Sequence, residues 1–246
     1  ADHLILDPEA FSRLCLEGLD FVSTHDALVT LGIQPTRPDT GYGYIQHELN
    51  AVADNIFRVK TFTEKPNLEL ARTFLKSGDF LWNAGIFLWN VQSILSAFRR
   101  HQKDLLELFE QEEDRINTPG EADAVRFIYS QCTNISIDYA VMEKAENVFV
   151  IPADFGWSDL GTWNSAYDNM EKDSLSNAVS GRNVMVIDAT QCMVKTSGEK
   201  LVVLQGLDNF IVIDTADVLL VCSRDKEQEI RDYVADIKRN KGDKYL

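Results

Sequence analysis

The stretch "TFTEKPN", Thr61–Asn67, places a carboxylate and an ammonium group side by side at the end of a predicted strand. Pro66 ends that strand, because proline lacks the amide hydrogen that a sheet ladder needs. Successive side chains of a strand point to opposite faces, so Glu64 and Lys65 are not expected to neutralise each other. Glu64 could then accept hydrogen bonds from hydroxyl groups, and Lys65 could neutralise a phosphate. The alternative is a pair of solvated surface charges.

Two aspartates, Asp2 and Asp159, stand next to predicted strands. Asp2 precedes the short apolar segment "LIL", and Asp159 lies in the Gly/Trp-rich segment "GWSDLGTW". Proteins usually hold Mg²⁺ with one or two carboxylates together with substrate phosphates, so this pair could bind the ion. The alternative is that each aspartate forms a turn or caps a helix. The four histidines show no ligand spacing, which disfavours a histidine metal site.

Two further segments carry small or polar residues that could contact a ligand. Gly41 and Gly43 flank Tyr42, and a glycine allows a ligand to approach the backbone closely. The alternative there is a plain tight turn. Asn83 and Gly85 lie in "WNAG", between two bulky apolar runs. A polar amide in such surroundings needs hydrogen bonds, so Asn83 either turns the chain or contacts a sugar hydroxyl.

Composition restricts the partners of the chain. The 246 residues carry a formal net charge of −15, which disfavours a nucleic acid as partner. An anionic substrate must therefore meet a local basic group or a metal ion. No run approaches the length of about 18 apolar residues that crosses a membrane. The four cysteines are widely spaced, which disfavours a disulfide framework and favours a reducing cytoplasm.

Strands and helices alternate in residues 1–172, which favours an α/β domain around a mixed, mostly parallel sheet. Asp7 is typical of a helix N-cap. Asn67 and Gly78 mark the two ends of a short helix, and one longer amphipathic helix is expected over 91–111. Ligands of open α/β sheets bind outside the carboxyl ends of the strands, so the polar loops described above are expected to converge on one site.

The pattern changes in residues 173–246. Short β-type runs follow one another with Gly, Asn and Asp turns between them, and no helical pattern intervenes until the last segment. These features predict a small second domain made of strands. An amphipathic helix, "KEQEIRDYVADIKRN", closes it.

The order of six segments is more specific than any one of them. "ADHLI", "LGIQPTRPDTGYGYI", "FTEKP", "WNAGIF", "SIDYAVMEK" and "FGWSDLGTW" follow one another along the chain. This order resembles the sugar-1-phosphate nucleotidyltransferases, and within them the bacterial guanylyltransferases that act on mannose 1-phosphate. The likeness extends over essentially the whole chain. It implies a Rossmann-like nucleotidyltransferase domain followed by a small left-handed β-helix that helps to form a homodimer.

The resemblance also implies roles for individual residues. Asp2 and Asp159 match the two aspartates that hold catalytic Mg²⁺. Lys65 matches the active-site lysine that contacts the sugar phosphate, and Glu64 matches a glutamate that hydrogen-bonds sugar hydroxyls.

Three residues match substrate contacts of the family: Gly43, Asn83 and, in the same "NAG" segment, Gly85. Asp138, in "SIDYAVMEK", matches a further motif residue and is assigned to substrate binding, although it could equally cap the helix that follows.

The reaction implied by the resemblance joins GTP to mannose 1-phosphate and gives GDP-mannose and pyrophosphate. The family's glycine-rich nucleotide signature, of the form G-G-x-G-x-R, does not occur in the sequence, so we expect the chain to lack the N-terminal part of that domain. Two alternatives stay open. The enzyme could use another sugar 1-phosphate or nucleotide, or the chain could be a non-catalytic regulatory subunit that binds a sugar nucleotide.

Overall fold

The computed structural model describes residues 3–245. They divide into two compact units. Residues Ile5–Trp157 form the barrel unit, and residues 158–245 together with residues 3–4 form the β-helix unit. Two short strands, β1 (Leu4–Ile5) and β7 (Trp157–Ser158), pair with each other, and the division between the units falls within both of them. Among the described residues, no helix is both long and apolar enough to cross a membrane.

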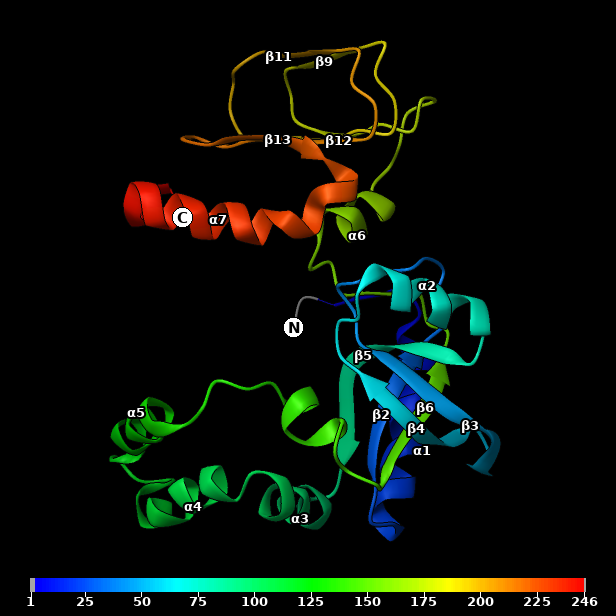
Figure 1. The fold of residues 1–246 in the computed structure, drawn as a ribbon, viewed down its shortest axis with the longest axis vertical. Helices are drawn as coiled ribbons and strands as arrows, with labels where there is room; N and C mark the ends of the chain where they lie inside the picture. Colours follow the sequence, from blue (N-terminus) through cyan, green and yellow to red (C-terminus); the bar gives the residue numbers. More distant parts are fainter. Residues whose placement is uncertain (1–2, 246) are drawn as a thin grey trace. The chain divides into compact units, whose positions relative to one another are not determined.

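Five strands of the barrel unit close on themselves in the order β2-β5-β3-β4-β6 (Figure 1). They are β2 (Leu28–Ile33), β3 (Tyr44–Ala53), β4 (Ile56–Thr63), β5 (Phe80–Trp89) and β6 (Val148–Ala153). Strands β2 and β6 are parallel. The other neighbours, β2–β5, β3–β5, β3–β4 and β4–β6, are antiparallel.

The sheet is therefore mixed, as the sequence predicts. The prediction that it is mostly parallel is wrong for the described strands. For β3 and β4 the reason is their connection, which is a turn at Asp54 and Asn55 rather than a helical crossover. A hairpin makes its two strands antiparallel. Apolar patterning identifies strands, but it does not give their direction.

Helix α1 (Pro8–Thr24) packs along the barrel with an apolar face that includes Leu14 and Phe21. The predicted N-cap is confirmed, because the Asp7 side chain accepts a hydrogen bond from the Ala10 amide at 2.9 Å. Each end of a helix leaves backbone groups without intrahelical partners, and a side-chain cap supplies one.

Helix α2 (Leu68–Ser77) also has the predicted ends. Asn67 accepts from the Leu70 amide at 2.9 Å, and Gly78 follows the helix with φ of 78°, in the left-handed region that favours glycine.

The segment expected to form one helix over 91–111 forms two, and that prediction is wrong. Helix α3 (Val91–His101) ends at Gln102, and α4 (Lys103–Gln111) begins directly after it. Gln102 has φ of −142° and donates from its side chain to the Ala140 carbonyl at 3.2 Å, so a tertiary contact holds the break.

The remaining helical elements of the barrel unit are η1 (Glu113–Arg115), α5 (Glu121–Gln131) and the π-helical turn η2 (Asp138–Met142). Helices α4 and α5 extend away from the barrel strands in Figure 1.

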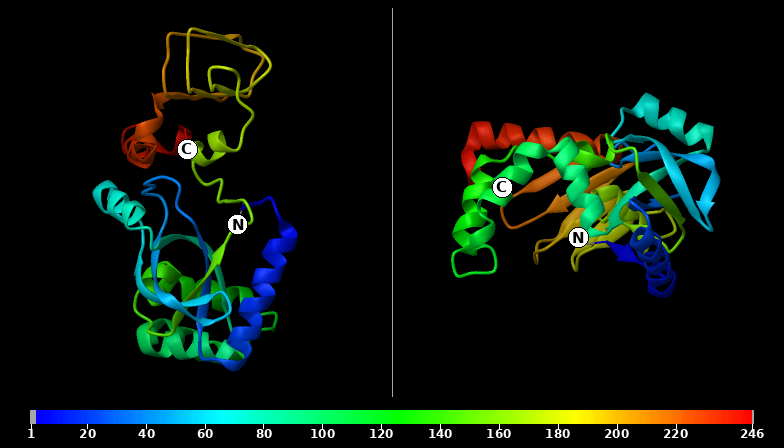
Figure 2. Two further views of the ribbon diagram at one scale, coloured as in Figure 1. Left: turned by 90° about the vertical axis from the view of Figure 1, so that its right-hand side faces the viewer. Right: turned by 90° about the horizontal axis from the view of Figure 1, so that it is seen from below.

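The strands of the β-helix unit form successive turns of a flattened coil, visible in the yellow and orange segments of Figure 2. In one sheet β8, β10 and β12 are parallel, and β13 is antiparallel to β12. The other sheet pairs β9 with β11 in parallel. The strands are β8 (Ala178–Ser180), β9 (Val184–Ile187), β10 (Met193–Thr196), β11 (Val202–Gln205), β12 (Phe210–Asp214) and β13 (Leu219–Ser223). A β-helix-like domain is thus confirmed, and its left-handed sense stays a prediction.

Alternation along β10 and β12 gives the coil two apolar layers. Val194 and Val212 point inward, where they pack with residues of β9 and β11. Met193 and Ile211 point outward and pack against Tyr167 of α6. Four helical elements belong to this unit: α6 (Trp163–Asp168), η3 (Arg224–Glu229), α7 (Ile230–Lys241) and η4 (Gly242–Tyr245).

This outer layer explains where the two compact units divide. Helix α6 lies within the segment 1–172 that the sequence predicts as one domain, yet its apolar face is buried against the coil. The compact units accordingly divide at Ser158.

Candidate functional site

Asn83, on β5, joins four segments of the barrel unit. Its side-chain nitrogen donates to Asp138 Oδ1 at 3.0 Å. Its side-chain oxygen accepts from Thr30 Oγ1 at 3.0 Å and from the Gly85 amide at 3.1 Å, and its backbone amide donates to the Gly43 carbonyl at 2.8 Å. The residue is only 9% exposed, so these bonds replace those that its amide would make with water.

The backbone around Asn83 departs from a regular strand. The register between β2 and β5 shifts between Thr30 and Gly32, and Gly85 has φ of 68°. A positive φ is accessible to glycine without the clash that a Cβ atom causes. The irregularity turns the Gly85 amide toward the Asn83 side-chain oxygen.

Glu64 lies directly against Gly43. A Cβ atom built on Gly43 would stand 2.5 Å from Glu64 Oε2 and 3.3 Å from Asn83 Cβ. The close approach that a glycine permits at this position is thus made by the Glu64 carboxylate. Gly43, Glu64 and Asn83 therefore form one cluster, at the start of β3, just after the end of β4 and within β5.

Lys65 forms an ion pair with Glu64, so the expectation that the two side chains diverge is wrong. Strand β4 ends at Thr63, and Lys65 has φ of 45°, in the left-handed region. Strand alternation does not apply beyond the end of the strand. The Glu64 side chain is 6% exposed and the Lys65 side chain 42%, so the carboxylate lies inside the cluster and the ammonium group at its mouth.

Burial raises the pKa of Glu64 above its ordinary value. Hydrogen bonding to Lys65 offsets part of this rise, whereas the negative charges of Asp138 and Glu143 add to it. A carboxylate that sits among other carboxylates and is largely removed from water attracts positive charge and hydrogen-bond donors.

Glu143 and Thr30 belong to the cluster, although neither is predicted as a site residue from the sequence. The Glu64 amide donates to Glu143 Oε1 at 3.0 Å, which fixes the backbone of the turn after β4. Glu143 lies in "SIDYAVMEK", and its acidic side chain at the end of that motif is a sequence signal. Thr30 is the hydroxyl within the apolar run "ALVTLGI", and a polar residue in a buried strand also needs an explanation.

The "GYG" loop is held by aromatic and hydrogen-bond contacts. The Tyr42 ring lies 5.0 Å from the Trp82 ring, centroid to centroid, in an edge-to-face arrangement. Tyr44 Oη donates to the Asp39 carbonyl at 2.9 Å, and Arg37 Nη2 lies 2.9 Å from Asp39 Oδ2. These contacts fix the loop that precedes β3, and with it the position of Gly43.

Of the two predicted metal ligands, one lies among the described residues. Asp159 follows β7 in the β-helix unit, where its Oδ1 accepts from the Gly161 amide at 3.1 Å. Asp2 lies outside the described residues. Within residues 3–245, no group of three or more His, Cys, Asp or Glu side chains is arranged to hold a metal ion.

The chain matches two family models. Residues 1–176 match the family described as "Nucleotidyl transferase", and residues 181–237 match a "MannoseP isomerase/GMP-like beta-helix domain".

Named relatives point in the same direction. The alginate biosynthesis protein AlgA of Pseudomonas syringae pv. tomato is 35% identical over 96% of this chain and 48% of that protein. The mannose-1-phosphate guanylyltransferase of Escherichia coli is 33% identical over 100% of this chain and 52% of that protein. The chain thus spans about half the length of the bacterial relatives it matches.

A solved structure shares the fold. The Thermus thermophilus protein described as a mannose-1-phosphate geranyltransferase superposes with a TM-score of 0.80 at 30% identity. The alignment covers 96% of this chain and 68% of that one. The family model, the two relatives and this structure agree, and the chain belongs to the nucleotidyl transferase family.

Proposed function

We propose that the whole protein transfers GMP from GTP to mannose 1-phosphate, giving GDP-mannose and pyrophosphate. The observation that supports this most is the convergence of Gly43, Glu64, Lys65, Asn83 and Asp138 at one end of the barrel. Such a cluster combines a cation for a phosphate with acceptors and an amide for sugar hydroxyls. The named relatives favour mannose 1-phosphate and GTP over other pairs of substrates.

Lys65 is proposed to neutralise the sugar phosphate. Its side chain is 42% exposed and pairs with the buried Glu64 carboxylate, so a phosphate can reach the ammonium group from the solvent side. Catalysis of phosphoryl transfer depends mainly on positioning and on charge stabilisation. In the reaction, an oxygen of mannose 1-phosphate forms a bond to the α-phosphorus of GTP, while the bond from that phosphorus to pyrophosphate breaks.

Glu64 and Asn83 are proposed to bind the sugar hydroxyls. The raised pKa of Glu64 reflects a carboxylate short of water, and a hydroxyl would supply the hydrogen bond that water cannot. Gly43 leaves room for the Glu64 side chain. Two hydrogen bonds fix the Asn83 side chain. Its nitrogen donates to Asp138 Oδ1 at 3.0 Å, and its oxygen accepts from the Gly85 amide at 3.1 Å.

Mg²⁺ is proposed as the cofactor, with Asp2 and Asp159 as its ligands. Carboxylate oxygens are the donors that this ion prefers. In support, β1 follows Asp2 in the sequence and pairs with β7, which directly precedes Asp159. Bound Mg²⁺ would neutralise charge on the nucleotide phosphates.

A homodimer through the β-helix unit is also proposed. Met185 and Ile187 of β9 are exposed at the outer face of their sheet, and Val203 of β11, which pairs with Met185, is exposed beside them. Neighbouring exposed apolar side chains of this kind favour contact with a second surface. A cytoplasmic location stays a prediction.

A substrate panel tests the proposed activity. The full-length protein is incubated with Mg²⁺ and with each of GTP, UTP and dTTP, against mannose 1-phosphate and glucose 1-phosphate, and pyrophosphate release is measured. We expect the highest kcat/KM with GTP and mannose 1-phosphate. A higher value with another pair would assign the protein to another substrate, and no release with any pair would favour the regulatory subunit.

A further inference from the structure

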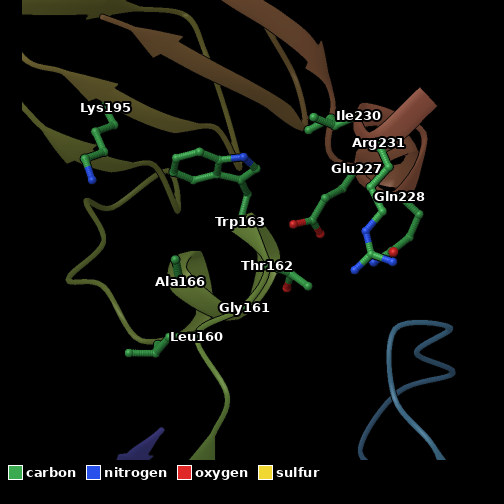
Figure 3. Close-up of a pocket in the computed structure, with 10 residues that line it drawn as sticks. All are labelled: Leu160, Gly161, Thr162, Trp163, Ala166, Lys195, Glu227, Gln228, Ile230 and Arg231. Carbon is green, nitrogen blue, oxygen red and sulfur yellow. The ribbon is translucent and has the colours of Figure 1, made fainter. Parts of the chain in front are cut away.

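The β-helix unit contains a pocket of about 420 Å³ that the proposed reaction does not use. Trp163 and Thr162 form one wall, and Lys195 of β10 lies at the edge (Figure 3). Glu227 of η3 and Arg231 of α7 form the opposite wall. The volume lies within the range of about 300–1,000 Å³ that is typical of small-molecule sites.

Trp163 supplies an aromatic surface inside this pocket. The side chain packs in part against the cluster of Tyr167, Met193 and Ile211, and the residue is only half buried. Figure 3 shows the ring between Lys195 and Arg231. The Lys195 ammonium nitrogen lies 5.9 Å from the ring centroid. Planar ring systems such as nucleic-acid bases stack on such an indole surface.

The pocket is basic, although the chain as a whole is acidic with a net charge of −15. Lys195 and Arg231 each lack an ion-pair partner among the described residues. Cations left unpaired in an acidic protein are available to an anionic ligand, and both belong to the same pocket.

Glu227 is the acidic residue of the pocket, and its carboxylate is already engaged. One oxygen accepts from the Asn164 amide at 3.1 Å, and the other accepts from the Asn164 side chain at 2.6 Å. Arg224 donates to the Asn164 side-chain oxygen at 3.0 Å. These bonds join η3 to α6 and fix the two walls, so the pocket is preformed and a ligand need not order it.

We propose that this pocket binds a nucleoside phosphate, with the base stacked on Trp163 beside Lys195 and the phosphate paired with Arg231 on the other side of the ring. An apolar ligand would leave the two cations without partners, and inorganic phosphate would leave the indole ring uncovered. A nucleoside phosphate carries both the planar ring and the negative charge. The proposal concerns binding in the β-helix unit and does not rest on the catalytic role of the barrel cluster.

Fluorine NMR of the full-length protein labelled with 5-fluorotryptophan tests this proposal at the residue itself. The Trp163 resonance is assigned by its loss in Trp163→Phe. GMP is the probe, and guanosine and inorganic phosphate are titrated separately. We expect GMP to shift the Trp163 resonance in a saturable manner, with a midpoint at least about tenfold lower than that of either part alone.

Two variants decide the result. In the double variant K195A/R231A we expect the GMP midpoint to rise by about tenfold or more, because the charge partner of the phosphate and the cation beside the stacked base are both lost. Lys241→Ala removes one positive charge from the same helix, α7, outside the pocket, and the midpoint should stay at the wild-type value. The proposal is overturned if GMP leaves the Trp163 resonance unmoved, or if the midpoint in the double variant equals that of the wild type.

Discussion

The two units each contain a buried asparagine, and they use it differently. In the β-helix unit, Asn177 is 1% exposed and bonds to Asp173 and to the backbone of Ala189 and Cys192, all within one turn of the coil. In the barrel unit, Asn83 bonds to Thr30 and Asp138, which lie 53 and 55 residues away along the chain, and to Gly43. The hydrogen bonds of Asn177 stabilise the repeating coil, whereas those of Asn83 bring together residues of the candidate site.

The surroundings of the two amides sharpen the difference. Asn177 is enclosed by backbone groups and one aspartate, so its hydrogen bonds stabilise the coil alone. Next to Asn83 lies the ion pair of Glu64 and Lys65. It reaches the surface through Lys65, and its buried carboxylate, Glu64, has a raised pKa. Ionisable groups with perturbed pKa values are found at functional sites more often than hydrogen-bonded buried amides are.

Removing the cation of the barrel cluster should have the largest effect. In Lys65→Ala we expect kcat/KM for GTP and mannose 1-phosphate to fall by about 10²–10³-fold, because the sugar phosphate loses its charge partner. Steady-state pyrophosphate release measures it. Lys76→Ala, an exposed cation on α2, is the matched control and should keep wild-type activity. Near-normal turnover in Lys65→Ala would remove Lys65 from the mechanism.

Asp159 is the residue of the β-helix unit that we expect to affect turnover. In Asp159→Asn the Mg²⁺ concentration for half-maximal activity should rise about tenfold or more, since a neutral amide is a weaker ligand than a carboxylate. Asp154→Asn, at an exposed position before Phe155, serves as the control. An unchanged Mg²⁺ titration in Asp159→Asn would contradict metal binding there.

The two asparagines can be compared directly. Asn83→Asp and Asn177→Asp each place a new carboxylate against an aspartate that now accepts a hydrogen bond, at 3.0 Å in both cases. Each should lower the free energy of unfolding by about 3 kcal/mol, measured by denaturant titration. Turnover of the remaining folded protein should fall in Asn83→Asp alone. Adding Asp138→Asn to Asn83→Asp should partly restore stability. Loss of turnover in both Asn83→Asp and Asn177→Asp would contradict the distinction between the units.

A smaller effect is expected from adding one methyl group beneath Glu64. In Gly43→Ala the new Cβ atom would lie 2.5 Å from Glu64 Oε2, so the carboxylate must move. We expect KM for mannose 1-phosphate to rise about five- to tenfold with little change in melting temperature. Gly198→Ala, in the β-helix unit, meets only one atom at 3.8 Å and should leave KM unchanged. Equal KM values in both variants would mean that the position of Glu64 is unimportant.

The smallest effect concerns pH and stability. The raised pKa of Glu64 means that the folded state binds its proton more tightly than the unfolded state does. Its contribution to stability is therefore full below the unfolded pKa and is lost as pH rises through the folded pKa. Glu64→Gln does not titrate, so its melting temperature minus that of the wild type should increase from about pH 4 to about pH 8. A difference that decreases over this range would contradict the raised pKa.

Local features of the fold were predictable because they depend on a few neighbouring residues. The caps at Asp7 and Asn67 and the glycine end at Gly78 follow from hydrogen-bonding side chains and from φ at single positions. Strand direction was not predictable, because the same apolar run serves a parallel or an antiparallel neighbour. The break at Gln102 is also tertiary, since it depends on a contact with Ala140.

The candidate site shows the same division. Gly43, Glu64, Lys65, Asn83 and Asp138 could be named from motifs, but their mutual contacts could not. The pairing of Lys65 with Glu64 depends on the left-handed φ of 45° after β4, which no pattern of strand alternation contains. Thr30 and Glu143 stand out in the sequence, but the hydrogen bonds between distant segments that bring them into the site could not be predicted from it.

Calorimetric titration of mannose 1-phosphate tests the central claim most directly, namely that the barrel cluster binds the sugar phosphate. The titration uses full-length protein with Mg²⁺ and an α,β-methylene analogue of GTP, which cannot react. We predict that Lys65→Ala weakens binding by about tenfold or more and that Lys76→Ala leaves it unchanged. Equal dissociation constants for the wild type and Lys65→Ala would contradict the account.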